Sequence, residues 1–318
     1  MGTYIIRRIL QMLLILLLVT LIVFFMVRLL PGDPILMFLS SQDLEKITQE
    51  QLDFLKHDLG LDRPMIVQYF EWLGDVSRGD LGKSIITRRD IVDDVKTRLP
   101  ITFQIGALSF IVSIVIGIPI GVIAAIKRGT WVDNLLTSVG NLGICTPNFW
   151  LGILLIYLVG YKAGWLPIFG YVSPFDDPWG NIQHIILPVF VLGTAPIASG
   201  LRLTRSSMLE VLRQDYIRTA WSKGLKQQTI IIRHGLKNGL IPVITLKGMT
   251  LAAIVGGSVI VETVFSIPGM GRLAVEGLFA KDYTIVQATL LIGAVVTLAA
   301  NLLVDLSYGW LDPRIRYR

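Results

Sequence analysis

Six long apolar segments constrain what this chain can fold into, because each is long enough to cross a lipid bilayer. A transmembrane helix needs about 20 mostly apolar residues. Four of the segments contain no Asp, Glu, Lys or Arg, whereas the first contains Arg28 and the fifth contains Lys247. The segments are residues 9–30, 100–126, 135–161, 182–201, 240–261 and 284–304. The sequence therefore predicts an all-α membrane protein with six spanning helices.

Composition excludes several other classes of protein. Hydrophobic residues make up 53% of the chain and charged residues only 16%, whereas soluble proteins average about 25% charged residues. A soluble enzyme is therefore excluded, and so is a disordered chain, which is poor in apolar residues. The single cysteine, Cys145, excludes an intrachain disulfide and a metal site built from cysteines.

The distribution of Lys and Arg predicts the orientation in the membrane. Residues 1–8 and the connections on the same side of the predicted helices carry 15 Lys and Arg, whereas the two short connections on the other side carry 3. Cytoplasmic loops are the ones enriched in Lys and Arg. Both termini are thus expected in the cytoplasm, with the first span as an uncleaved anchor. The net charge of +6 is explained by these loops, so no nucleic-acid partner is expected.

The chain is expected to divide into three parts: residues 1–30 with the first span, an extracytoplasmic loop over 31–99, and a core over 100–318. The loop carries 9 Lys and Arg against 13 Asp and Glu. Apolar residues recur at helical spacing over 44–59 and 65–76, which predicts a small helical subdomain between the first two spans. A solvated tether is the alternative.

Motifs typical of catalysis are incomplete. Gly82-Lys83-Ser84 resembles the end of a phosphate-binding loop, but Ser77 stands where the first glycine is required. The three histidines share no metal-ligand spacing, and no HExxH or GxSxG motif occurs. The chain is therefore expected to be no enzyme, to have no catalytic or metal-binding residues and to bind no cofactor of its own.

Two charged residues of the fifth span are candidates for a translocation path. Lys247 lies seven residues into the span, roughly 10 Å from its start, and an ionisable residue at such depth is a functional candidate. The alternative is that its ammonium extends along the stem toward the cytoplasmic face. Glu262 and Asp305 lie at span ends, where solvation is expected to be easy, and Glu262 is the second candidate.

The longest predicted cytoplasmic loop, residues 202–239, carries eight Lys and Arg against Glu210 and Asp215. Its sequence predicts a helix that stops at Gly224, followed by a second helix that leads back to the membrane. Glycine is favoured in the left-handed conformation that ends a helix, and Lys223 suits the last turn. A basic segment lying on anionic lipid would explain the charge but not the glycine break.

The run Arg218-Thr219-Ala220 with Gly224 resembles the coupling loop of ABC importer permeases, which has a Glu-Ala-Ala…Gly pattern. Three further stretches resemble the dipeptide/oligopeptide (and nickel) permease family, of its first-permease type: RLLPGDP at 28–34, ETVFSIPGMG at 262–271 and DPRIR at 312–316. The sequence departs from the general pattern at Arg218, where Glu is usual, and in the larger distance from Gly224 to Pro242.

The resemblance implies a six-helix bundle of the type I importer fold, in the cytoplasmic (inner) membrane of a bacterium or archaeon. It implies a second homologous permease, two cytoplasmic ATPases that hold ATP and Mg²⁺, and an extracytoplasmic solute-binding protein as partners. The implied substrate is a di- or oligopeptide, with a nickel chelate, glutathione or an oligosaccharide as alternatives. The residues implied to couple this chain to the ATPases are Asp215, Tyr216, Arg218, Thr219, Ala220, Lys223, Gly224 and Leu225.

Two other classes of transport protein are weaker candidates. A secondary transporter needs carboxylates for a coupling ion near the middle of the membrane. The predicted spans have no carboxylate at that depth, and Lys247 is the one charged residue there. A passive channel has no need of the basic helix–glycine–helix loop.

Overall fold

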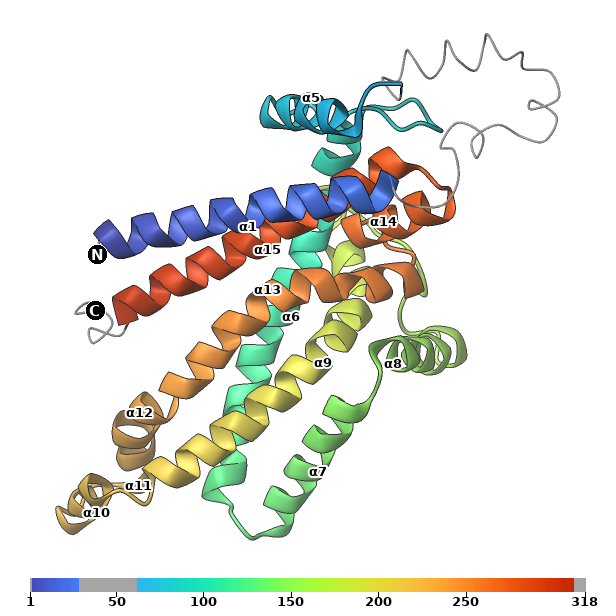
Figure 1. The fold of residues 1–318 in the computed structure, drawn as a ribbon. Helices are drawn as coiled ribbons and strands as arrows, with labels where there is room; N and C mark the ends of the chain where they lie inside the picture. Colours follow the sequence, from blue (N-terminus) through green and yellow to red (C-terminus); the bar gives the residue numbers. More distant parts are fainter. Residues whose placement is uncertain (1, 29–61, 312–318) are drawn as a thin grey trace. The chain divides into compact units, whose positions relative to one another are not determined.

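The computed structural model describes residues 2–28 and 62–311, and the regular elements in these ranges are helices (Figure 1). Within the described ranges the only strand-like feature is an isolated bridge between Lys83 and Asp90. The all-α fold class is thus confirmed. The expected helix at 44–59, most of the stretch at 28–34 and the stretch at 312–316 lie outside the described residues.

The chain forms two compact units, one made of residues 1–101 and 268–302 and the other of residues 102–267 and 303–318. The division expected at residues 30 and 99 stays a prediction. The helices that contribute to the first unit are α1 (Gly2–Arg28), α5 (Met65–Ser77), the start of α6 (Ile91–Ile126), α14 (Met270–Phe279) and most of α15 (Tyr283–Leu311).

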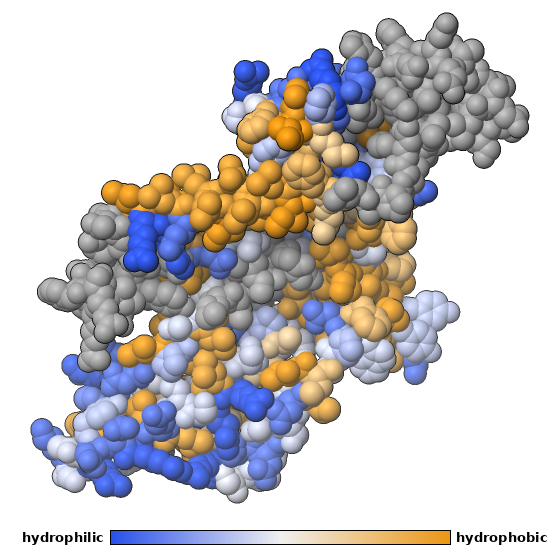
Figure 2. Space-filling view, viewed as in Figure 1, coloured by the Kyte–Doolittle hydropathy of each residue, from blue (hydrophilic) through white to orange (hydrophobic). Residues whose placement is uncertain are grey.

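In the first unit, α5 packs against α1 through aromatic and polar contacts, and its presence confirms the helix expected at 65–76. The rings of Tyr69 and Phe24 meet edge to face at 5.4 Å, and the hydroxyls of Tyr69 and Thr20 lie 3.0 Å apart. Arg28 Nε donates to Gln68 Oε1 (2.9 Å). The part of α1 before Thr20 exposes its leucines (Leu10, Leu13, Leu14, Leu17 and Leu18) in an apolar band (Figure 2), as expected of a helix that faces lipid.

The second unit contains the remaining helices of the bundle. Its long helices are the rest of α6, α9 (Pro178–Val211) and α13 (Ile241–Val264). The shorter ones are α7 (Trp131–Cys145), α8 (Asn148–Leu155), the π-helix η1 (Ile156–Lys162), α10 (Asp215–Ser222), α11 (Gln227–Thr229), the π-helix η2 (Ile230–Leu236) and α12 (Lys237–Gly239).

Most of the predicted spans appear as long helices. Among the described residues, four helices (in α1, α6, α9 and α15) are long and apolar enough to cross a membrane, and a bent pair of helices makes a fifth. The helix expected over 240–261 is α13, whose 24 residues extend about 36 Å at 1.5 Å per residue; the side chains of residues 249–257 in it are not described.

The third predicted span, residues 135–161, corresponds to a bent pair of helices and not to one continuous helix. It is divided into α7 and the pair α8–η1, whose axes are bent by 105° at the break. Thr146 is extended, with ψ of 121°, because the ring of the following Pro147 disfavours the helical conformation of the preceding residue. The proline therefore ends α7, and α8 starts in a new direction.

Small residues bring α6 and α9 into close contact. A Cβ at Gly117 would lie 2.7 Å from the carbonyl oxygen of Ile197, and one at Gly121 would lie 2.6 Å from Thr204 Cβ. Glycine allows transmembrane helices to approach until their backbones touch. This crossing holds α9, the helix that leads into α10, against the bundle.

Candidate functional site

The predicted coupling segment is the short helix α10, which is joined to α9 by only three residues. The loop expected to begin at 202 is wrong in its first part, because α9 continues to Val211; residues 202–211 contain no Gly or Pro that would end a helix. The helix–glycine–helix order is otherwise present, with α10 before Gly224 and the consecutive helical elements α11, η2 and α12 after it.

Gly224 ends α10 in the way that its sequence predicts. Its φ is +72°, in the region where only glycine is free of strain. Its N–H donates to the carbonyl of Trp221 (2.9 Å), and the N–H of Leu225 donates to the carbonyl of Ala220 (3.4 Å). This pair of bonds is a Schellman motif, which gives α10 a defined end and direction.

One face of α10 is buried in a small apolar cluster. Ile217 and Ala220 pack with Ile230 of η2, and Leu212 adds a partly buried side chain. An isolated helix of eight residues is unstable in water, so these contacts hold α10 in place. Ala220, one of the predicted coupling residues, contributes to this cluster, where it is 7% exposed.

The remaining surface of α10 is exposed and combines aromatic with charged side chains. Tyr216 and Trp221 are 42% and 50% exposed, and Arg218 pairs with Asp215 one turn away (3.2 Å). Tyr216 also accepts a hydrogen bond from Asn238 Nδ2 (2.9 Å), which links α10 to α12. Hydrophilic side chains gather over this end of the second unit (Figure 2).

The eight predicted coupling residues therefore lie together in α10 and in the turn that ends it, although with different environments. The exposed ones are Asp215, Tyr216, Arg218, Thr219, Lys223, Gly224 and Leu225. No local sequence pattern indicates the anchoring roles of Ile230 and Asn238, which depend on tertiary packing. For Ile217 a signal was available, because residues three apart lie on the same face of a helix and Ile217 lies three residues before Ala220. The roles of the eight in coupling stay predictions.

Lys247 is buried among three helices, so the expectation that its ammonium extends to the cytoplasmic face is wrong. The side chain is 3% exposed, and Nζ donates to Ser113 Oγ of α6 (2.9 Å) and to the carbonyl of Pro196 in α9 (2.6 Å). The Lys247 side chain fits against α9 because residue 200 is glycine: a Cβ at Gly200 would lie 3.0 Å from Lys247 Nζ. A part in the translocation path stays a prediction.

Glu262 is also buried, so the expectation of easy solvation at the end of the span is wrong. It is 0% exposed, and Thr102 Oγ1 donates to Glu262 Oε1 (2.7 Å). The chain turns back directly after α13, where Ile267 N donates to the carbonyl of Glu262 (2.8 Å). This turn and α6 remove the carboxylate from solvent; its place in a translocation path stays a prediction. The side chain of Asp305 is not described.

The chain matches two family models that together cover almost all of it. Residues 117–317 match the model described as binding-protein-dependent transport system inner membrane component. Residues 1–106 match the model of the N-terminal part of such membrane components. The longer match includes α10 and the segments on both sides of it.

Similar proteins agree with the family models in length and fold. The oligopeptide transport system permease protein AppB of Bacillus subtilis (strain 168) is 40% identical over 320 residues, covering 100% of both chains. The glutathione transport system permease protein GsiC of Escherichia coli O6:H1 is 36% identical over 318 residues, with the same coverage. In the inward-facing MetNI methionine ABC transporter, one solved chain has a TM-score of 0.52 at 16% identity, covering 67% of this chain and 95% of that one; this likeness supports the importer fold.

Proposed function

Because this chain belongs to the family of binding-protein-dependent transport system inner membrane components, we propose that it is the permease subunit of an ATP-driven importer of di- or oligopeptides. The observation that carries the proposal is the 40% identity to an oligopeptide permease over the full length of both chains. The exposed and capped helix α10 supports it from the structure, since a permease of this kind needs a rigid element on which an ATPase can dock.

The proposed complex has this chain beside a second homologous permease, with two ATPases on the cytoplasmic side and a solute-binding protein outside. In this arrangement α10 faces the cytoplasm, both termini lie there too, and the ATPases hold ATP and Mg²⁺. The excess of Lys and Arg in the connections on that side supports this orientation.

In the proposed mechanism, the ATPases move α10 and the helix bundle responds by changing its access. A nucleotide can shift the bundle only if the ATPases bind its two conformations with different affinity. Ile217 and the Schellman turn at Gly224 keep α10 rigid, whereas Tyr216, Trp221 and the basic side chains form the contact surface. Arg218 and Lys223 are positioned to bind acidic or carbonyl groups on the ATPase.

Glutathione is the second candidate substrate, and the specific observation in its favour is the 36% identity to a glutathione permease. Glutathione is itself a short peptide, so the two candidates share a backbone and a free carboxylate. The higher identity to the oligopeptide permease favours peptides in general.

The test is co-purification from detergent-solubilised membranes that contain this subunit with the candidate ATPases and second permease. We expect wild type to recover both ATPases and the second permease, and Gly224→Pro to lose the ATPases, because proline cannot adopt a positive φ and has no N–H to donate. Gly164→Pro is the matched control, since Gly164 also has a positive φ (+64°) but lies in the connection between η1 and α9. Recovery of wild type as a homo-oligomer without ATPases would contradict the proposal.

A further inference from the structure

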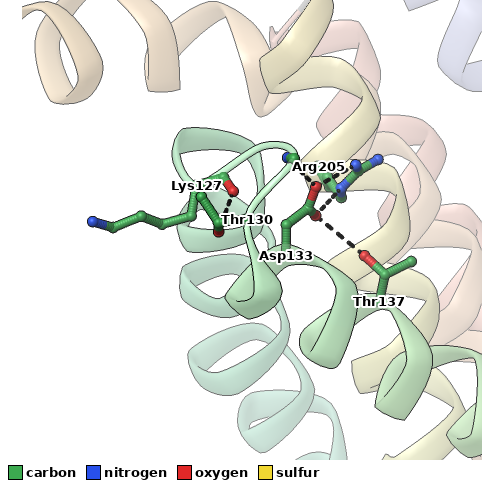
Figure 3. Close-up of polar contacts among 6 residues, drawn as sticks. Lys127, Thr130, Asp133, Thr137 and Arg205 are labelled. Atoms are coloured by element: carbon green, nitrogen blue, oxygen red, sulfur yellow. Dashed lines mark hydrogen bonds and ion pairs between the residues drawn. The ribbon is translucent and has the colours of Figure 1, made fainter.

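An ion pair between the buried Asp133 of α7 and the partly exposed Arg205 of α9 joins these two helices (Figure 3), and Arg205 lies six residues before the end of α9 at Val211. Arg205 Nε donates to Asp133 Oδ1 (2.6 Å), and Arg205 Nη2 donates to Asp133 Oδ2 (2.8 Å). Asp133 is 2% exposed. Two parallel bonds between a guanidinium and a carboxylate fix distance and direction at once, so this pair constrains the two helices more than a single bond would.

The same carboxylate also fixes the turn between α6 and α7. The N–H of Gly129 donates to Asp133 Oδ2 (3.0 Å), and Thr137 Oγ1 donates to Oδ1 (3.3 Å). Gly129 has a φ of +77°, and the turn is closed by Thr130 Oγ1, which donates to the carbonyl of Lys127 (2.6 Å; Figure 3). One side chain thus connects the end of α6, the start of α7 and the side of α9.

The path from α10 to this ion pair runs through a short hydrogen-bonded turn into α9. Leu212 N and Gln214 N donate to carbonyls of the last turns of α9, and Ile217 N donates to the carbonyl of Gln214 at 3.0 Å. The apolar cluster described above also holds α10 against Leu212. Arg205 lies seven residues before Leu212, which is roughly 10 Å along a helix, so a displacement of α10 reaches Arg205 through the hydrogen-bonded turn at residues 212–214 and then through α9.

We propose that Asp133 and Arg205 are positioning residues that make α7 move together with α9 when α10 is displaced. The inference rests on the proposed function, because it assigns a route for the force that the ATPases apply. The helices also lie close along their length, since a Cβ at Gly143 would meet Ala198 Cβ at 3.4 Å. Such apolar contacts allow sliding, whereas the bidentate pair opposes it.

A contribution to stability alone is the competing explanation, and two kinds of variant separate the two. Asp133→Asn removes the charge of the buried carboxylate and leaves the partly exposed Arg205 guanidinium (side chain 28% exposed) without its counter-charge, which weakens the link and lowers the stability of the fold. The double variant Asp133→Leu with Arg205→Met replaces the pair by apolar side chains, an exchange that is often neutral or stabilising. It removes the directional link while keeping the helices packed.

The experiment measures peptide uptake per ATP hydrolysed by the whole complex in proteoliposomes, with binding protein and an oligopeptide supplied. We expect Asp133→Asn to lower this ratio about tenfold or more, because a charged hydrogen-bonded pair is lost. The apolar double variant should match wild type in assembly and Tm while its ratio stays low. Arg202→Gln is the matched control on α9, since Arg202 is exposed, and should behave as wild type.

Three outcomes test the positioning role of Asp133 and Arg205. A low ratio in the apolar double variant at wild-type Tm supports the positioning role. A wild-type ratio in that variant, or in Asp133→Asn, overturns the inference while wild-type uptake leaves the proposed function intact. A wild-type complex that assembles but takes up no peptide with ATP overturns the proposed function, and this inference with it.

Discussion

Gly121 is a residue where the addition of one methyl group should have a measurable effect. A Cβ there would lie 2.6 Å from Thr204 Cβ and 2.7 Å from the carbonyl oxygen of Leu201, so in Gly121→Ala α6 and α9 must separate. Overpacking of this kind lowers the free energy of unfolding by about 1–3 kcal/mol. We expect a lower Tm for the purified protein in detergent by differential scanning fluorimetry.

The control for this substitution is Gly74→Ala in α5, where nothing lies within 4 Å of the added Cβ. Alanine in an open helical position stabilises by about 0.5–1 kcal/mol relative to glycine, so its Tm should be unchanged or slightly higher. Equal Tm values for Gly121→Ala and Gly74→Ala would contradict the close approach of α6 and α9.

Lys247→Met should also lower Tm, for a different reason. The substitution removes the two hydrogen bonds that join α13 to Ser113 and to the carbonyl of Pro196, and hydrogen bonds of charged groups contribute about 1.5–3 kcal/mol each. Ser113 keeps its own bond to the carbonyl of Phe110. A wild-type Tm combined with lost peptide uptake would contradict this role in packing and favour one in the translocation path.

Gly224, Lys247 and Glu262 show how far single residues can be interpreted from the sequence. The left-handed conformation of Gly224 follows from local chemistry, because glycine after a basic last turn is a common helix end, and the structure has it. The burial of Lys247 and Glu262 depends on Ser113, Pro196 and Thr102, which lie far away in the chain. No local pattern contains that information.

At the scale of the element, the stability of α10 should depend on one buried side chain. Ile217 is 1% exposed and packs with Ile230. Ile217→Ala removes buried methyl groups at a cost of about 2–5 kcal/mol, so α10 should open locally more often. We expect amide hydrogen exchange over residues 215–222 to become at least about tenfold faster, measured by mass spectrometry.

The comparison for that measurement is Trp221→Ala, which truncates a side chain of α10 that is 50% exposed. Amide hydrogen exchange over residues 215–222 should stay near the wild-type rate in this variant, because an exposed side chain contributes little to packing. If the two variants exchange equally fast, the apolar cluster does not hold α10 in place.

Elements differ in how much of them the sequence predicts. The bounds of α5 and the end of α10 were predicted within a residue or two, because the apolar spacing over 65–76 and the glycine at 224 mark them locally. The third span was predicted from its apolar length, which carries no information on the angle between two helical segments. The 105° bend at Pro147 is stabilised by tertiary contacts of α8, such as Gly152 beside Phe265. The continuation of α9 past residue 201 was missed because its charges suggested a loop.

At the scale of the whole molecule, the transmembrane class and the family followed from the sequence more directly than any site did. Apolar length is a constraint imposed by the bilayer, so it is visible without tertiary knowledge. The motif around Arg218 and Gly224 then indicated the family, which the family model confirms. The ion pair of Asp133 with Arg205 could not be predicted, since neither residue lies in a motif and 72 positions separate them.

The orientation of the whole chain can be tested with cysteines placed on the two predicted sides. In a Cys145→Ser background, which removes the single native cysteine, Asp176→Cys and Lys223→Cys each place one thiol at an exposed position. The excess of Lys and Arg around Lys223 predicts that this side is cytoplasmic. A membrane-impermeant maleimide should label the thiol at position 176 in intact spheroplasts and the one at 223 only after permeabilisation. The reverse pattern would place α10 outside, away from any cytoplasmic ATPase, and would contradict the proposed coupling role together with the orientation.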